Sequence, residues 1–135
     1  MIVWIQFLSS FWMTAIIWFV QIVHYPLFKY VSYDNRLAYQ KQHMYLISWI
    51  VMPAMIIELS SLLLLGQKVS FSLQWIILIT CLLVIWLSTF LLQVPYHQQL
   101  LQNPQDKVII KLIQSNWIRT IIWTVKTVLI LIWFI

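Results

Sequence analysis

The three histidines of this sequence are its best candidates for chemistry near neutral pH, because an imidazole can bind a metal ion or exchange a proton. His24, His43 and His97 lie near the same end of three different apolar segments. Imidazoles from three helices at similar depth could ligate a transition metal or a haem iron, with all three rings as metal ligands. The alternative is that each ring forms hydrogen bonds with loop carbonyls or lipid headgroups. No His-x-x-His or Glu-x-x-His spacing is present.

Other polar residues recur every three or four positions in the apolar segments, which places them on one face of each helix. Arg119 is suited to a carboxylate or a phosphate, and amide side chains can both donate and accept hydrogen bonds. The alternatives are an arginine that reaches the membrane surface and amides that join helices. The candidate catalytic residues are His24, His43, His97, Tyr25 and Glu58, and the candidate cofactor-binding residues are Gln21, Gln93, Asn116, Arg119, Trp123 and Lys126.

Glu58 and Lys126 are opposite charges inside apolar segments. At about 1.5 Å per residue, each lies roughly 12 to 14 Å from the outer end of its helix. An unpaired charge in such a segment is costly, so we expect the two side chains to form an ion pair. The same rise places Glu58 about 22 Å from His43. Glu58 is therefore not expected to bind the same ion as the histidines.

The composition excludes several classes of protein. Hydrophobic residues make up 63% of the 135 residues and charged residues only 8%, whereas soluble domains carry about 25% charged residues. A water-soluble monomer, a disordered tail and a nucleic-acid-binding module are therefore excluded. Because Cys81 is the single cysteine, the chain has no internal disulfide, no Cys-x-x-Cys pair and no thiolate metal cluster.

The apolar segments predict an all-α, polytopic membrane protein with a bundle of four transmembrane helices. A spanning helix needs about 20 mostly apolar residues, and four segments qualify, at about 2–24, 35–65, 71–94 and 104–135. They form one domain over residues 1–135. The first segment has no basic start and no small-residue cleavage site, and it is interpreted as a retained helix.

Turn residues predict the helix ends and a relation between the two halves. Pro26 and Pro95 are expected to end the first and third helices. Asp34 and Asn103 are expected to cap the second and fourth helices, and Gly66 to end the second. Because one offset relates both prolines and both caps, a parallel 2+2 repeat of helical hairpins is predicted. Two unrelated hairpins are the alternative, since the other side chains differ.

The cations predict the orientation of the chain. Lys29, Arg36 and Lys41 lie in the first connection, and Lys107 and Lys111 in the third. The second connection holds only one basic residue. By the positive-inside rule, the first and third connections face the cytoplasm. A multi-pass protein of the bacterial inner membrane with both termini outside is therefore expected.

Motifs along nearly the whole chain resemble a known family. They are QIVHYPLF at 21–28, QVPYH at 93–97 and NWIRTIIW at 116–123, together with Tyr39, His43, Pro53 and Glu58. This combination resembles a family of small bacterial four-helix integral membrane proteins to which no activity is assigned. The resemblance implies a four-helix membrane fold. The architecture is also similar to the anthrone-oxygenase-like proteins and the haem-binding membrane protoporphyrinogen oxidases, which are small four-helix membrane oxidoreductases.

Three functions remain open from the sequence. The first is a small membrane oxidoreductase or cofactor-binding protein that acts on a hydrophobic small molecule or lipid, with Tyr25 as proton donor and Arg119 as anchor. The second is a small transporter that uses the Glu58 and Lys126 charges. The third is a non-catalytic subunit whose polar stripes pack against a membrane partner or a second copy in a homo-oligomer. The lipid bilayer is a partner in all three, and no nucleic acid is expected.

Overall fold

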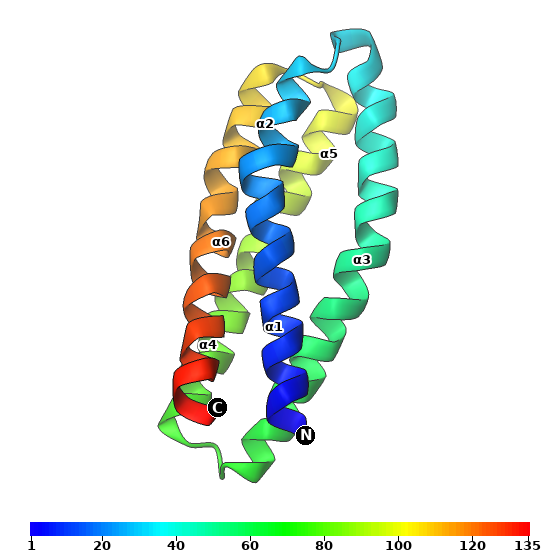
Figure 1. Cartoon of the computed structure of the whole chain (residues 1–135). Coiled ribbons are helices and arrows are strands. Elements are labelled where there is room, and N and C mark those ends of the chain that lie inside the picture. Colours follow the sequence, from blue (N-terminus) through cyan, green and yellow to red (C-terminus); the bar gives the residue numbers. More distant parts are fainter.

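A computed structural model of residues 1–135 shows four long helical rods and no strand (Figure 1). The first rod runs from α1 (Ile2–Phe19) through a π-helical turn (Val20–His24) and α2 (Tyr25–Leu27) to a 3-10 turn (Phe28–Tyr30). The second rod is α3 (Tyr33–Lys68). The third comprises α4 (Leu73–Ser88), a π-helical turn (Thr89–Gln93) and α5 (Val94–Gln102), and the fourth is α6 (Asp106–Phe134).

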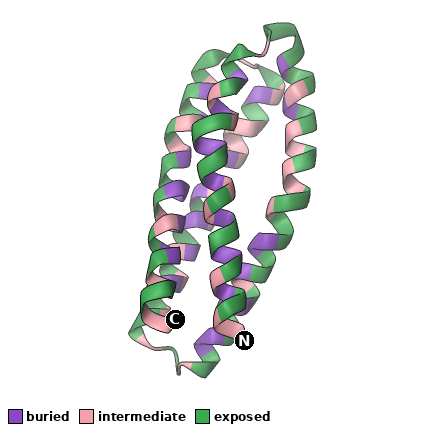
Figure 2. Cartoon of the chain, in the orientation of Figure 1, coloured by how far each residue is buried: buried purple, intermediate pink, exposed green.

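All four rods are long and apolar enough to cross a membrane, and they span Ile2–Tyr30, Tyr33–Lys68, Leu73–Gln102 and Asp106–Phe134. The prediction of an all-helical fold with four such helices is therefore confirmed. The two termini lie at the same end of the bundle, beside the turn between α3 and α4 (Figure 1). Exposed residues run along the outer face of every rod (Figure 2), and many of them are large and apolar.

The expectation that Pro26 and Pro95 end their helices is wrong. A proline has no backbone N–H, so the carbonyl four residues earlier loses its helical partner. Here a π-helical turn, which contains one extra residue, precedes each proline, and the helix continues past it. The N–H of Tyr25 bonds to the carbonyl of Val20, and the N–H of Val94 bonds to that of Thr89. Both rods therefore continue beyond their prolines.

The predicted caps also differ from the structure. The N-cap of α3 is Ser32, with Asp34 in the first turn, and α6 begins after Gln105, while Asn103 follows the end of α5. The residue before a proline favours extended geometry, and Asn103 has φ −149° and ψ 95°. Gln105 is extended as well. The fourth helix therefore starts after Pro104 and not at it.

Gly66 lies inside α3 and does not end it. The indole ring of Trp75 lies against its open face, and a Cβ at position 66 would be 2.5 Å from the Cε2 atom of that ring. The Nε1 of Trp75 donates to the carbonyl of Leu62 at 2.7 Å, which fixes the ring in place. Ser70 and Phe71, with φ of 49° and 53°, then reverse the chain into α4. Gly66 is therefore needed for close packing of α3 against the start of α4.

Three clusters of buried apolar side chains hold the rods together. The central cluster consists of Met13, Ile17, Ala54, Met55, Ile85 and Trp123. The cluster near the first and third connections consists of Val20, Tyr25, Phe28, Leu100, Ile109 and Leu112. The cluster near the termini consists of Leu62, Leu65, Leu78, Leu82 and Ile130. The first two clusters contribute walls to the cavity described below.

We expect Gly66→Ala to destabilise the bundle. The new methyl group would overlap the Trp75 ring, and overpacking of this kind costs about 1 to 3 kcal/mol. Thermal unfolding in detergent measures the loss, with Gln67→Ala at the neighbouring exposed position as the control. An unchanged melting temperature for Gly66→Ala would contradict the packing described here.

Candidate functional site

A cavity of about 440 Å³ lies between the rods. Most of its wall is apolar and includes Met13, Ile17, Val51, Met55 and Trp86. Towards the first and third connections the lining becomes polar, and there it consists of Tyr25, His43, Thr89, Gln93, His97 and Arg119. The cavity therefore has an apolar body and one polar end, which is the form of many small-molecule sites.

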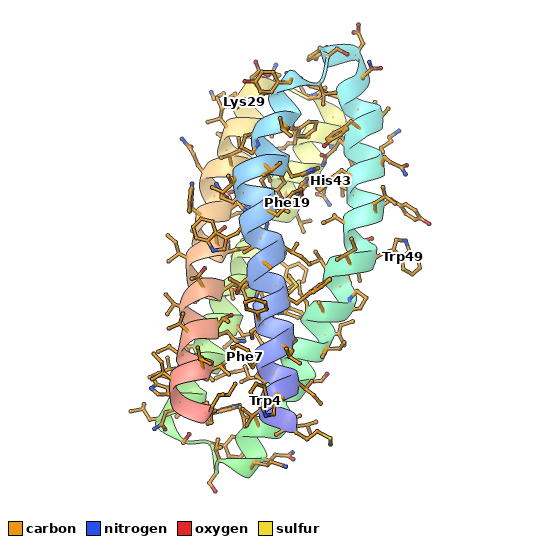
Figure 3. All side chains as sticks on the ribbon, in the orientation of Figure 1. Trp4, Phe7, Phe19, Lys29, His43 and Trp49 are labelled. Carbon is orange, nitrogen blue, oxygen red and sulfur yellow. The ribbon has the colours of Figure 1, made fainter.

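The three histidines come together at this polar end. The ring centroids of His24 and His43 are 4.3 Å apart and stacked, and those of His43 and His97 are 5.5 Å apart. His43 points from α3 towards the interior, whereas Trp49, two turns further along, points away from the bundle (Figure 3). The cluster that the sequence predicts on depth alone is therefore present. His43 and His97 line the cavity, and His24 lines a smaller groove beside it.

A chain of hydrogen bonds runs from Gln40 through His97 to Tyr25. The Nε2 of Gln40 lies 2.7 Å from Nδ1 of His97, and the Nε2 of His97 lies 3.0 Å from the Tyr25 hydroxyl. Gln40 and Tyr25 are both buried. Both nitrogens of the His97 ring are therefore engaged within the protein.

The direction of this chain follows from its geometry. The Gln40 atom that contacts Nδ1 also lies 3.2 Å from the main-chain carbonyl oxygen of His97, which can only accept. The amide atom there is therefore nitrogen, and it donates to Nδ1. A neutral imidazole that accepts at Nδ1 carries its proton on Nε2, so His97 donates to Tyr25. The hydroxyl hydrogen of Tyr25 is then free for a molecule in the cavity.

The same geometry does not fit a metal ion held by three histidines. The structure contains no group of three His, Cys, Asp or Glu side chains placed to hold a metal ion. A ligating imidazole needs a free lone pair on one nitrogen, and His97 has none because Gln40 occupies Nδ1 and Nε2 carries the proton. The predicted metal or haem site formed by His24, His43 and His97 is therefore not supported.

The amides form a network between rods. The Nδ2 of Asn116 donates to Oε1 of Gln21 at 2.7 Å, and the Nε2 of Gln21 donates to the carbonyl of Ile113 at 3.2 Å. The Nε2 of Gln93 donates to Ser115 at 2.7 Å. Neither Gln21 nor Asn116 lines the cavity, so both act as interhelical links. Of the predicted binding residues, Gln93, Arg119 and Trp123 do line it.

Arg119 is held in this network by neutral groups. Its Nε and Nη2 donate to Oδ1 of Asn116, its Nη2 donates to Oε1 of Gln93 at 3.3 Å, and its Nη1 lies 3.5 Å from the Thr89 hydroxyl. The side chain is 8% exposed. No carboxylate contacts it. The guanidinium charge is therefore buried beside the cavity without an anionic partner from the chain.

The predicted ion pair between Glu58 and Lys126 is confirmed. The Nζ of Lys126 lies 2.8 Å from Oε1 of Glu58, and both side chains are fully buried. Ser10 lies between them, since it accepts from Nζ at 2.6 Å and donates to Oε1 at 2.7 Å. The Nε1 of Trp123 donates to both carboxylate oxygens, at 3.1 and 3.2 Å. Neither charge lines the cavity, although the Trp123 ring does.

Gln40 and Arg36 are neighbours of the site that are not among the site residues predicted from the sequence. Both lie on the face of α3 that also carries His43, at spacings of three and seven residues, and this spacing was the signal that could have found them. Arg36 donates to the carbonyls of Val31 and Pro104 and pairs with Asp106. It therefore joins the first and third connections above the polar end of the cavity.

No protein-family model, no curated protein and no solved structure matches this chain. The likeness of its motifs to the small four-helix membrane proteins thus stays a resemblance.

We expect Glu58 and Lys126 to act as one unit in stability. Glu58→Gln or Lys126→Met alone leaves a buried charge without its partner, which costs roughly 3 to 5 kcal/mol. The double substitution should cost less than the sum of the two single substitutions. Thermal unfolding of all four proteins in detergent measures this coupling, and Lys111→Met at an exposed position of α6 is the control. Strictly additive losses would show that the pair contributes no coupling.

Proposed function

We propose that the chain is a polytopic protein of the bacterial inner membrane that binds a hydrophobic substrate in the cavity and donates a proton to it from Tyr25. The observation that carries this proposal is the direction of the Gln40, His97 and Tyr25 chain, which leaves the phenolic hydrogen unused at the polar end of an apolar cavity. A substrate oxygen, such as a carbonyl or hydroxyl oxygen, is the natural acceptor for that hydrogen.

The outer surface supports a location in the bilayer. Large apolar side chains such as Phe11, Trp49 and Leu91 are more than half exposed. In water such a surface would drive aggregation, whereas in lipid it is the ordinary exterior of a helical bundle. The basic first and third connections lie at one end and both termini at the other, and the positive-inside rule then favours termini outside the cytoplasm.

The mouth of the cavity supports access from the bilayer. Met52, Ile56 and Phe90 line the cavity and are also more than half exposed on the outer face. They belong to α3 and to the π-helical turn after α4. An apolar molecule dissolved in lipid could therefore pass between these two rods without crossing water.

The neighbours of Tyr25 suit a proton donor. When the phenol gives up its proton, the oxygen acquires negative charge, and the Nε2–H of His97 already points at that oxygen. The Arg119 cation lines the same end of the cavity. Proton donation to a substrate oxygen is a step shared by reductions, in which a separate reductant supplies the hydride, and by isomerisations, in which a separate base removes a proton. The oxidoreductase predicted from the sequence is therefore one member of the reaction class proposed here.

The repeat of two parallel hairpins is also a proposal. Its support is that both π-helical turns begin at the same distance before their prolines, Val20 before Pro26 and Thr89 before Pro95. In each half the wide turn carries polar residues of the site, His24 in the first and Gln93 in the second. The presence of a π-helical turn at matching positions in both halves favours a common origin for the two hairpins.

The binding role of Tyr25 can be tested with a panel of long-chain probes. Purified protein in detergent is mixed with palmitic acid, methyl palmitate or cetyl alcohol, and native mass spectrometry measures the fraction with one bound probe. We expect saturable one-to-one binding of at least one probe. Tyr25→Phe should weaken that binding about threefold to tenfold, the effect of one hydrogen bond.

The control for this panel is Tyr30→Phe, because Tyr30 is 85% exposed and lies outside the cavity. It should bind like the original protein. If none of the three probes binds, or if Tyr25→Phe and Tyr30→Phe bind equally well, the proposed function is wrong.

The orientation can be tested by thiol labelling in intact bacterial cells. In a Cys81→Ala background, single cysteines replace Lys41, Lys107 or Ser70, all of which are exposed. We expect the first two to resist a membrane-impermeant thiol reagent and the third to react rapidly, since the α3–α4 turn is the one connection between helices that faces outward in this orientation. Rapid labelling at position 41 or 107 would show that the protein has the opposite orientation in the membrane.

A further inference from the structure

We infer that the substrate of this cavity is an anionic amphiphile with a single hydrocarbon chain, whose carboxylate or phosphate head binds Arg119 and Tyr25. This inference rests on the proposed function and narrows its substrate to one chemical class. It is carried by the charge balance of the buried interior, by the unused donors at the polar end, and by the shape of the apolar part of the cavity.

The charge balance leaves Arg119 without an anion. The chain has three acidic residues. Glu58 is bound to Lys126, Asp106 is bound to Arg36, and Asp34 is exposed in the first turn of α3. A buried charge without a partner is costly, and the groups around Arg119 are neutral: the amides of Asn116 and Gln93 and the hydroxyls of Thr89 and Tyr25. A bound anion would supply the missing negative charge and offset this cost.

The donors at the polar end match an anionic head. A guanidinium has five N–H groups, and the contacts to Asn116, Gln93 and Thr89 occupy four of them. The remaining Nη1 N–H makes no hydrogen bond of normal geometry to an amide or to Thr89, and Arg119 lies within interaction distance of the Tyr25 oxygen. The Tyr25 hydroxyl hydrogen adds a second donor in the same lining. Two donors, one of them charged, suit the two oxygens of a carboxylate or two oxygens of a phosphate.

His43 supplies a further hydrogen-bonding group for such a head. It lines the main cavity and both smaller grooves, and its ring makes no hydrogen bond within the protein. Its stacking on His24 holds the ring in place without using either nitrogen. A free nitrogen in the same lining as Arg119, with its ring centroid 6.3 Å from that of Tyr25, can bond to the remaining oxygen of a phosphate or to a hydroxyl next to a carboxylate.

The apolar part of the cavity suits one chain. The volume of the whole cavity, about 440 Å³, lies in the lower half of the range of roughly 300 to 1,000 Å³ for small-molecule sites. Lipid-exposed Met52, Ile56 and Phe90 continue the lining to the outer face. A single hydrocarbon chain can fill this path and extend into the lipid, whereas a two-chain phospholipid has too much volume for it.

The charge of the head is tested by comparing probes that differ only there. Native mass spectrometry of the whole protein in detergent measures the binding of palmitic acid, methyl palmitate and a monopalmitoyl lysophosphatidic acid. We expect an anionic probe to bind at least about tenfold more tightly than methyl palmitate, as expected for a charge-assisted hydrogen bond. Palmitic acid as the tighter probe identifies a carboxylate head, and lysophosphatidic acid as the tighter probe identifies a phosphate head.

Variants assign this preference to Arg119. Arg119→Gln should lower the ratio of anion binding to methyl palmitate binding to about one, the loss of a charge-assisted hydrogen bond. Arg119→Lys should restore part of that ratio because the charge returns. Lys111→Gln removes an exposed cation from the same helix and should have no effect. Arg119→Gln that keeps the full preference would overturn the assignment to Arg119.

The comparison within the unsubstituted protein decides the inference even where Arg119→Gln fails to fold. Equal binding of methyl palmitate and both anions would overturn the anionic substrate and leave the proposed function in place. Absence of binding by all probes, including cetyl alcohol, would overturn the proposed function itself. The two failures are therefore distinguishable.

Discussion

Polar groups inside an apolar bundle must find partners within it, and the Glu58–Lys126 pair shows how this constraint organises the molecule. The pair draws Ser10 from α1 and Trp123 from α6 to one carboxylate on α3. The indole that bonds to Glu58 is also a wall of the cavity. A buried ion pair of this kind does not need to add much net stability to be useful. Its consequence here is that three rods are held in register around the cavity.

The two prolines impose the second constraint. Each proline removes one helical hydrogen bond, and in each rod a π-helical turn with one extra residue precedes the proline. The extra residue rotates the side chains that follow around the helix axis. In the first rod this rotation brings Tyr25 to the buried side, next to His97. In the third rod Gln93 is the last residue of the wide turn itself, and its Oε1 accepts from Arg119.

These two constraints explain how far the sequence could predict the structure. The four helices, the ion pair and the polar end follow from hydropathy and from helical spacing, which depend on each segment alone. The continuation of the helices past Pro26 and Pro95 does not follow from the sequence. A proline shows that one helical hydrogen bond is lost, but it does not show whether the helix then ends or forms a π-helical turn and continues. Gln40 was missed for a related reason, since its role exists only where α5 brings His97 against α3.

The two buried cations of α6 differ in a way that separates structure from function. Lys126 bonds to the carboxylate of Glu58 and the hydroxyl of Ser10, so its charge is balanced within the fold. It does not line the cavity. Arg119, two turns earlier, has neutral partners and lies in the cavity lining. If Arg119 only joined helices, a neutral amide could join them through fewer hydrogen bonds and at a lower desolvation cost. The retention of a full charge at the one place where a molecule can reach it favours a role in binding.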